Sequence, residues 1–209
     1  MPLYRTTAGV VFFAHIPKTG GTSVEKTLKV AGASEAMKFR KKIGYSKATM
    51  QHMHAAIYRE AVGKDFADYS FTVVRNPYDR FASEYKMKVL DAGAQDPVHE
   101  WAKVNFNRFE EFSYTRDNHI RPQIEFVSKR VEVFTFENGL QAPVEAACKH
   151  LELEVPELRH EKRGSKTRLP ITTKGLIAIS NFYRDDFKKF GYDLDDYENS
   201  FELVNEGEN

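Results

Sequence analysis

The chain has 209 residues, of which 41% are hydrophobic and 29% charged, a composition that excludes a fibrous, low-complexity or disordered protein. A chain of this length can bury one substantial core, so we expect a single domain over residues 1–192. The formal net charge is +1, but residues 193–209 hold seven acids and no Lys or Arg. We expect this acidic tail to be loosely ordered. The first 192 residues then carry about +8, which favours polyanionic ligands.

Cysteine content and hydropathy limit where such a chain can reside. Cys148 is the only cysteine in the sequence, which excludes an intrachain disulfide and is compatible with a reducing compartment. The apolar run at residues 10–14 is too short for a membrane span or a signal-peptide core. We therefore expect a cytoplasmic protein with no membrane span, although a catalytic domain trimmed from a membrane-anchored parent would have the same sequence. Nothing in the sequence indicates an oligomeric state.

Strand and helix patterns alternate along the chain. A β-branched and aromatic strand at 10–14 runs through a glycine loop into a helix at 24–30. A second strand, 70–74, precedes a helix that Asn76 caps and that continues to Leu90. The other expected elements are a strand at 131–136 and helices at 55–62, 98–106, 108–114, 122–127, 143–151 and 173–190. This alternation favours an α/β domain with a mostly parallel sheet.

The glycine loop has the features of an anion-binding site. Amides at a helix N-terminus attract phosphate or sulfate, and Gly20 and Gly21 allow a close approach of the backbone. Lys18 adds a positive charge, while the hydroxyls of Thr22 and Ser23 add donors. Because Lys18 precedes the glycines, the loop is not a Walker A motif. An ordinary glycine turn with an exposed lysine is the alternative.

A second candidate anion site follows the strand at 70–74. Arg75 comes directly after this strand, and Ser83 lies two turns into the next helix. Ligands of open α/β sheets bind beyond the carboxyl ends of the strands, and a guanidinium with a hydroxyl suits a terminal phosphate. The alternative for Arg75 is a structural ion pair.

Both signatures resemble those of sulfotransferases that use 3′-phosphoadenosine 5′-phosphosulfate (PAPS). Residues 15–23, HIPKTGGTS, are similar to the 5′-phosphosulfate loop of the carbohydrate branch, which includes heparan 2-O- and chondroitin-type enzymes. Residues 74–85, VRNPYDRFASEY, resemble the 3′-phosphate site, and shorter matches occur at 122–123, 136–138 and 187–192. The resemblance implies a P-loop-like three-layer α/β domain with a central parallel sheet flanked by helices. It also implies transfer of a sulfuryl group from PAPS to a hydroxyl, which we expect to belong to a carbohydrate.

The resemblance also implies which residues bind the donor. The first loop would hold the phosphosulfate, Arg75 and Ser83 the 3′-phosphate, and a late basic loop would close over the nucleotide. The expected donor-binding residues are Pro17, Lys18, Thr19, Gly20, Gly21, Thr22, Ser23, Arg75, Ser83, Arg163 and Ser165. A solvated basic loop is the alternative for Arg163 and Ser165.

Sulfuryl transfer needs a base that removes the proton of the acceptor hydroxyl, and histidine is the usual choice near neutral pH. The family has its base between the two nucleotide signatures in a His-x-His or His-x-Thr pattern. Here the matching residues are His52 and His54, and the sequence does not decide between them. Helix-start or surface roles are the alternative for both. Lys18 is expected to stabilise the departing phosphate, and His15 to orient the loop.

The acceptor site is the least defined. His119 lies in a motif that resembles one from the middle of the family, and Arg40 and Lys42 belong to a basic run that suits a uronic-acid or sulfated glycan. A core or capping role for His119 and a solvated edge for the basic run are the alternatives. We expect no metal, because His-x-His alone lacks the further ligands of a zinc site, and no nucleic-acid partner. A nucleotide-triphosphate-dependent small-molecule kinase and a non-catalytic PAPS- or polyanion-binding module are the competing functions.

Overall fold

The computed structural model describes residues 1–39, 41–42, 47–63, 65–94, 96–158 and 167–205. The chain forms two compact units, each built from two separate stretches of sequence. The first unit comprises Met1–Val74 and Glu125–Arg163, and the second comprises Arg75–Ile124 and Gly164–Asn209. The boundary between Val74 and Arg75 falls directly after one of the expected strands.

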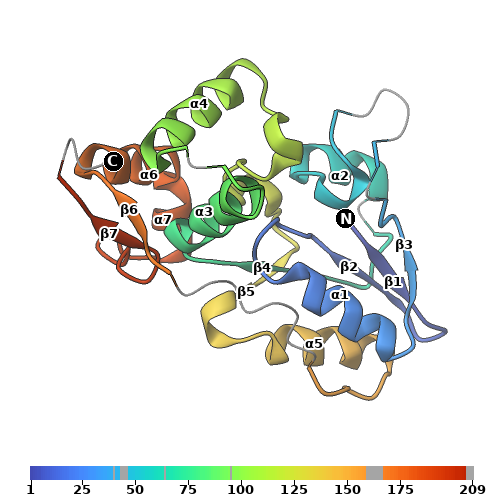
Figure 1. The fold of residues 1–209 in the computed structure, drawn as a ribbon. Helices are drawn as coiled ribbons and strands as arrows, with labels where there is room; N and C mark the ends of the chain where they lie inside the picture. Colours follow the sequence, from blue (N-terminus) through green and yellow to red (C-terminus); the bar gives the residue numbers. More distant parts are fainter. Residues whose placement is uncertain (40, 43–46, 64, 95, 159–166, 206–209) are drawn as a thin grey trace. The chain divides into compact units, whose positions relative to one another are not determined.

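A five-stranded sheet in the order β3-β1-β2-β4-β5 forms the centre of the first unit (Figure 1). Its strands are β1 (Leu3–Arg5), β2 (Val10–Phe13), β3 (Ser34–Ala36), β4 (Tyr69–Val74) and β5 (Glu132–Thr135). The pairs β2–β4 and β4–β5 are parallel, as expected. The pairs β1–β2 and β1–β3 are antiparallel, which corrects the expectation of a parallel sheet at this edge. The turn from β1 to β2 is too short for a parallel crossover, and the Thr6 N–H closes it on the Gly9 carbonyl at 3.1 Å.

Helices cover both faces of this sheet. Helices α1 (Gly21–Val30) and α5 (Gln141–Leu151) pack together on one face, over Phe13 and Phe71, whose rings stack with centroids 4.8 Å apart. Helix α2 (Ala55–Val62) packs on the other face, where the Tyr58 ring lies 4.9 Å from that of Phe12. The side chains of adjacent strand residues point to opposite faces of a sheet. Phe12 therefore packs against α2, and Phe13 packs against α1 and α5. The architecture is therefore mixed α/β, with a central sheet flanked by helices.

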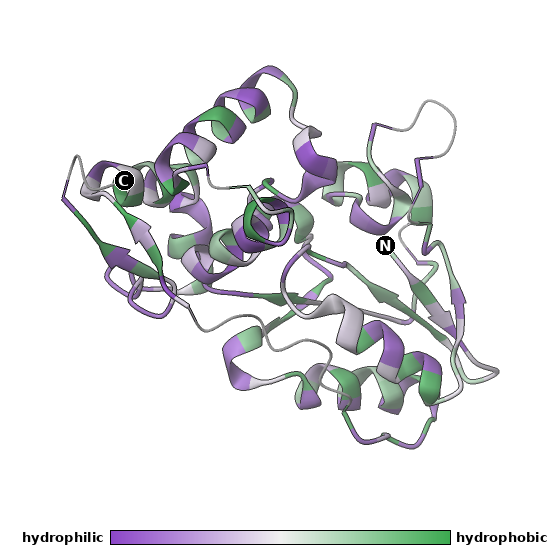
Figure 2. Cartoon of the chain, in the orientation of Figure 1, coloured by the Kyte–Doolittle hydropathy of each residue, from purple (hydrophilic) through white to green (hydrophobic). Residues whose placement is uncertain are grey.

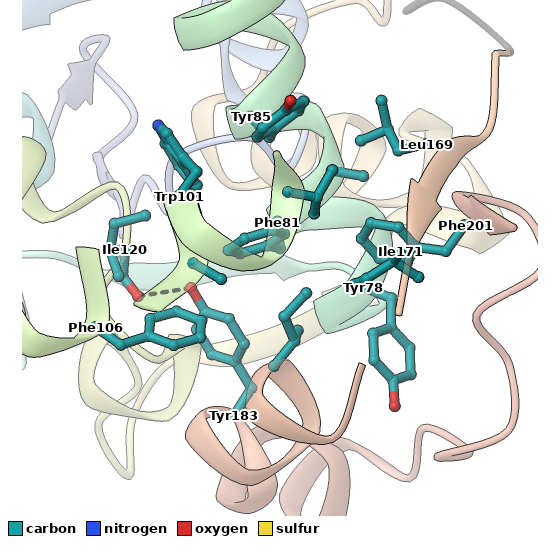
Figure 3. Packing of buried hydrophobic residues seen from close by; sticks show 14 of the residues in the cluster. Tyr78, Phe81, Tyr85, Trp101, Phe106, Ile120, Leu169, Ile171, Tyr183 and Phe201 are labelled. Atoms are coloured by element: carbon teal, nitrogen blue, oxygen red, sulfur yellow. Dashed lines mark hydrogen bonds between the residues drawn. The ribbon is translucent and has the colours of Figure 1, made fainter. Parts of the chain in front are cut away.

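The second unit is mainly helical. Its elements are α3 (Pro77–Tyr85), a π-helix (Lys86–Leu90), α4 (Val98–Glu111), α6 (Thr173–Phe182), α7 (Arg184–Phe190), and the parallel pair β6 (Leu169–Ile171) and β7 (Phe201–Leu203). Aromatic side chains fill its core (Figure 3), and the rings of Phe106 and Phe182 stack at 3.9 Å. The Tyr183 hydroxyl, buried in this core, donates to the Ile120 carbonyl at 2.9 Å. Burying a tyrosine usually requires such a partner.

Short 3-10 turns supply the remaining helical segments. They are Met50–His52, Thr115–Asn118, Gln123–Phe126 and Phe136–Asn138. The expected cap of α3 is confirmed, because the Asn76 side chain accepts the Tyr78 N–H at 2.9 Å and Pro77 starts the helix. The two helices expected at 98–106 and 108–114 are one helix, α4, and the one expected at 173–190 is divided at Tyr183.

Residues 193–205 are packed against the second unit, although we expected the acidic tail to be loosely ordered. Phe201 is fully buried in the aromatic core, and β7 pairs with β6. The Tyr78 hydroxyl also donates to the Leu194 carbonyl at 3.0 Å. Apolar residues between the acids therefore anchor this segment.

Figure 2 shows that hydrophobic and hydrophilic residues are also mixed along helix α4. Among the described residues, no helix has the length and apolar character needed to span a membrane.

Candidate functional site

The glycine loop leaves the carboxyl edge of the sheet. Strands β2 and β4 are parallel neighbours, so their carboxyl ends meet at one edge. There the Ala14 N–H donates to the Phe71 carbonyl at 2.9 Å, and the Thr72 hydroxyl donates to the Ala14 carbonyl at 2.6 Å. These two hydrogen bonds fix Ala14, where the loop after β2 begins, to strand β4. Arg75 follows the last residue of β4 in the chain, so both signatures begin where open α/β sheets bind ligands.

The backbone of this loop alternates between left-handed and other conformations. Lys18 and Gly20 have left-handed φ angles of 70° and 82°, whereas Thr19 between them does not. Alternation of this kind is typical of anion nests, in which successive N–H groups line one concave face. Thr19 is buried, and its hydroxyl donates to the Ile16 carbonyl at 2.9 Å, which fixes the turn. Helix α1 starts at Gly21, so its N-terminal amides and dipole add to the attraction for an anion.

Close contacts surround both loop glycines, and Gly20 also has a left-handed backbone conformation. A Cβ at Gly20 would lie 2.9 Å from Cε2 of Phe136, the residue that follows β5. A Cβ at Gly21 would lie 2.5 Å from Nε2 of His15. The His15 imidazole thus packs directly beneath the start of α1. An orienting role of His15 for the loop stays a prediction.

A buried carboxylate, Glu25, holds His15 in place. Glu25 is fully buried on α1, and its Oε1 is hydrogen-bonded to Nδ1 of His15. The Gln51 side-chain amide donates to the same oxygen at 3.1 Å. Lys38 Nζ lies 3.0 Å from Glu25 Oε2 and 3.0 Å from Oε1 of Glu35. One carboxylate therefore joins the loop, the segment before His52 and the start of the basic run.

The surroundings of Glu25 keep its carboxylate ionised. Burial alone would raise the pKa of Glu25, but the hydrogen bonds and positive charges of His15 and Lys38 outweigh it and lower the pKa to about 2. Burial likewise acts to lower the pKa of Lys38, but Glu25 and Glu35 outweigh it and raise that pKa above its ordinary value. Lys38 is thus engaged by two carboxylates, whereas Lys42 of the same basic run is exposed.

The two candidate base histidines differ in their surroundings. His52 ends the 3-10 turn Met50–His52, is half-buried, and its ring meets His15 edge-to-face with centroids 5.2 Å apart. His54 precedes α2 and is 8% exposed, and its carbonyl accepts the N–H groups of Ile57 and Tyr58. The ring contact with His15 connects His52 to the loop.

In the second unit, Arg75 lies beside one face of α3. Its Nη2 is 4.0 Å from Oδ2 of Asp79, and its side chain is 21% exposed. Ser83 is half-buried one turn after Asp79, and Lys86 follows three residues later. Burial lowers the pKa of Lys86 and the Arg75 charge lowers it further, although Asp79 opposes both. A guanidinium, an ammonium and a hydroxyl thus share one region, a donor set that suits a phosphate.

The family comparison covers the residues of both signatures. A model of the sulfotransferase family matches residues 3–193. The chain is a member of the sulfotransferase family. No curated protein and no solved structure matches it. The match covers the glycine-loop signature and the arginine signature. The family membership that these motifs predicted is therefore confirmed.

His119 of this sulfotransferase is held by a buried carboxylate. Its Nδ1 lies 2.7 Å from Oε2 of Glu84, which is buried on α3, and its carbonyl accepts from Arg80 at 2.8 Å. The preceding residues Arg116, Asp117 and Asn118 all have left-handed φ angles, of 51°, 55° and 64°. Such conformations cost free energy, so His119 is presented by a strained and tightly hydrogen-bonded turn.

The described contacts do not cover every predicted site residue. Arg40, Arg163 and Ser165 lie outside the described residues. Lys42 is exposed, and no described hydrogen bond or ion pair of Lys42 joins it to the loop. A cavity of about 900 Å³ in the first unit is lined by α2 and by the amino ends of β4 and β5, at the opposite edge of the sheet from the loop. It therefore plays no part in the site described here.

Sequence reasoning missed four supporting residues of the sulfotransferase. Glu25, Gln51, Lys86 and Gln123 were given no individual role, although each contacts or adjoins a predicted site residue. The signal for Lys86 was the spacing of Asp79, Ser83 and Lys86 along one helix face. Glu25 and Gln51 are distant in sequence from their partners, so no local pattern indicates their pairing.

Proposed function

We propose that this sulfotransferase transfers a sulfuryl group from PAPS to a hydroxyl of a carbohydrate. The observation that carries the proposal is the anion nest of Lys18, Thr19 and Gly20 at the start of α1, supported from below by His15 and Glu25. Such a nest suits a phosphosulfate, which offers several anionic oxygens to amides and to one lysine. No Walker A lysine follows the glycines, which disfavours a triphosphate donor.

The donor would bind through two separate anionic groups. Residues 17–23 would receive the 5′-phosphosulfate, and Arg75 and Ser83 the 3′-phosphate. Arg75 can present two N–H groups to one phosphate, and Lys86 adds a second positive charge beside it. Arg163 and Ser165 remain proposed contacts from the late loop.

In the proposed reaction a histidine removes the proton of the acceptor hydroxyl as its oxygen attacks sulfur. The bond between sulfur and the bridging phosphate oxygen breaks, and 3′-phosphoadenosine 5′-phosphate (PAP) departs with that electron pair. Lys18 and the loop amides stabilise the charge that develops on the departing phosphate. The contact of His52 with His15 favours His52 over His54 as the base. His119 and the basic run with Arg40 and Lys42 would contact the acceptor.

Calorimetric titration tests the donor assignment. Purified protein is titrated with PAP and with ATP, beside Arg75→Ala and the control Arg184→Ala, whose arginine is exposed on α7. We expect tight binding of PAP, weak binding of ATP, and a loss of PAP affinity of about 10- to 100-fold in Arg75→Ala alone. A preference for ATP would favour the kinase alternative, and PAP binding without turnover on any glycan acceptor would favour a binding module.

A further inference from the structure

The side chain of Gln123 is hydrogen-bonded to both main-chain groups of Arg75. Its Oε1 accepts the Arg75 N–H at 2.9 Å, and its Nε2 donates to the Arg75 carbonyl at 2.7 Å. Gln123 is fully buried. Only a carboxamide of this length offers one acceptor and one donor in this arrangement. The contact is thus specific to the backbone of a single residue.

These two bonds act on the short segment that joins β4 to α3. Strand β4 ends at Val74, which pairs with Thr135, and α3 begins at Pro77. Arg75 therefore lies in the turn between a strand ladder and a helix. The direction of its guanidinium depends on the φ and ψ angles of this turn. Gln123 supplies to Arg75 the two hydrogen bonds that a neighbouring strand would otherwise provide.

Asp186 fixes Gln123 in turn. Its Oδ2 accepts the Gln123 N–H at 2.7 Å, and its Oδ1 accepts the Ile124 N–H at 2.8 Å. Asp186 is fully buried at the start of α7. Burial raises the pKa of Asp186 to about 6, although its hydrogen bonds and the Arg80 charge oppose that rise. At pH 7.5 the carboxylate is ionised and holds both N–H groups.

We propose that Gln123 is a positioning residue that orients Arg75 and thereby sets the preference of the enzyme for a nucleotide with a 3′-phosphate. This inference rests on the proposed function, in which Arg75 binds that phosphate. Gln123 touches no donor atom in this scheme. Its effect passes through the Arg75 main chain, and it should leave binding of the 5′-phosphate largely unchanged.

The test compares two nucleotides that differ only in the 3′-phosphate. PAP and adenosine 5′-phosphate are titrated calorimetrically at pH 7.5 into the wild type, Gln123→Leu, Gln123→Glu and the control Gln141→Leu, whose glutamine is exposed on α5. We expect Gln123→Leu to lower the ratio of the two affinities by about 10-fold or more, chiefly by weakening PAP. Gln123→Glu keeps the acceptor but loses the donor, so an intermediate ratio is expected. Gln141→Leu should keep the wild-type ratio.

The outcomes separate this inference from the proposed function. If the wild type does not prefer PAP, the assignment of the 3′-phosphate site fails before any variant is considered. Suppose that the wild type prefers PAP and that Gln123→Leu folds. If this variant then keeps the ratio of the two affinities within twofold, or weakens the binding of both nucleotides equally, the positioning role is overturned. If thermal unfolding shows that Gln123→Leu does not fold, Gln123→Glu and Asp186→Asn decide the question by the same ratio.

Discussion

The Gln51 side-chain amide donates a 3.1 Å hydrogen bond to Oε1 of Glu25, which joins the residue before His52 to a carboxylate buried beneath the glycine loop. Glu25 also bonds His15, whose ring contacts both Gly21 and His52. The loop and the proposed base segment are therefore held by the same group.

Removing the charge of Glu25 should destabilise the first unit. Glu25→Gln leaves Lys38 and His15 without their buried carboxylate partner, so we expect the free energy of unfolding to fall by about 3 kcal/mol. Urea denaturation measures the change, and Glu154→Gln, at an exposed glutamate, is the matched control. If the free energy of unfolding of Glu25→Gln lies within about 0.5 kcal/mol of that of the control, the interactions of Glu25 with His15 and Lys38 contribute little to stability.

The same carboxylate should make stability depend on acid pH. The pKa of Glu25 is lowered from its ordinary value of 4.5 to about 2 in the folded protein. Its contribution is therefore present above pH 4.5 and is lost as the pH falls through 2, with a total of about 3 kcal/mol. Unfolding measured from pH 6 to pH 2 should show the wild type and Glu25→Gln converging in stability toward low pH. Parallel curves would exclude Glu25 as the source.

Adding one methyl group at Gly21 should disturb the loop. A Cβ there would lie 2.5 Å from Nε2 of His15, so Gly21→Ala must displace the imidazole or the start of α1. We expect a loss of PAP affinity of about 10-fold or more, measured by calorimetry. The double variant Gly21→Ala/His15→Ala makes room for the methyl group, so its loss should be smaller than the sum of the two single losses. Strict additivity would show that the two residues do not contact each other.

The choice between the two histidines can be made kinetically. If His52 is the base, His52→Ala should lower kcat by at least about 100-fold while PAP affinity stays within twofold. The acid limb of the pH profile of kcat/KM should disappear with it. His54→Ala should lower kcat less. A larger loss of kcat in His54→Ala than in His52→Ala would assign the base to His54. Normal turnover in the double variant would exclude both histidines as the base.

Lys18 should matter more for transfer than for binding. Lys18→Ala removes the charge that is proposed to stabilise the departing phosphate, so kcat should fall by about 100- to 1,000-fold. PAP affinity should fall less, because the loop amides and Arg75 remain. Lys29→Ala, at an exposed lysine on α1, provides the control. Near-normal turnover of Lys18→Ala with saturating PAPS would remove this role from the lysine.

Much of the architecture could be predicted from the chain itself because it depends on local patterns. The β-branched and aromatic runs at β2 and β4 and the Asn76–Pro77 helix start are short-range signals. The glycine loop between strand and helix likewise predicted the family, which the family match confirms. The short strands β1, β3, β6 and β7 were missed because three residues carry too little periodicity to be recognised.

The sequence by itself determined the family, the α/β architecture and the residue types that can meet an anionic donor, because these follow from motifs and periodicities within about twelve residues. Only the tertiary structure decided which other side chains hold these candidate donor-binding residues in place. Glu25 meets Gln51, and Gln123 meets Arg75, across 26 and 48 positions of sequence. Such pairs form when the packing of helices and strands brings buried polar groups together, and each group must then find a hydrogen-bond partner.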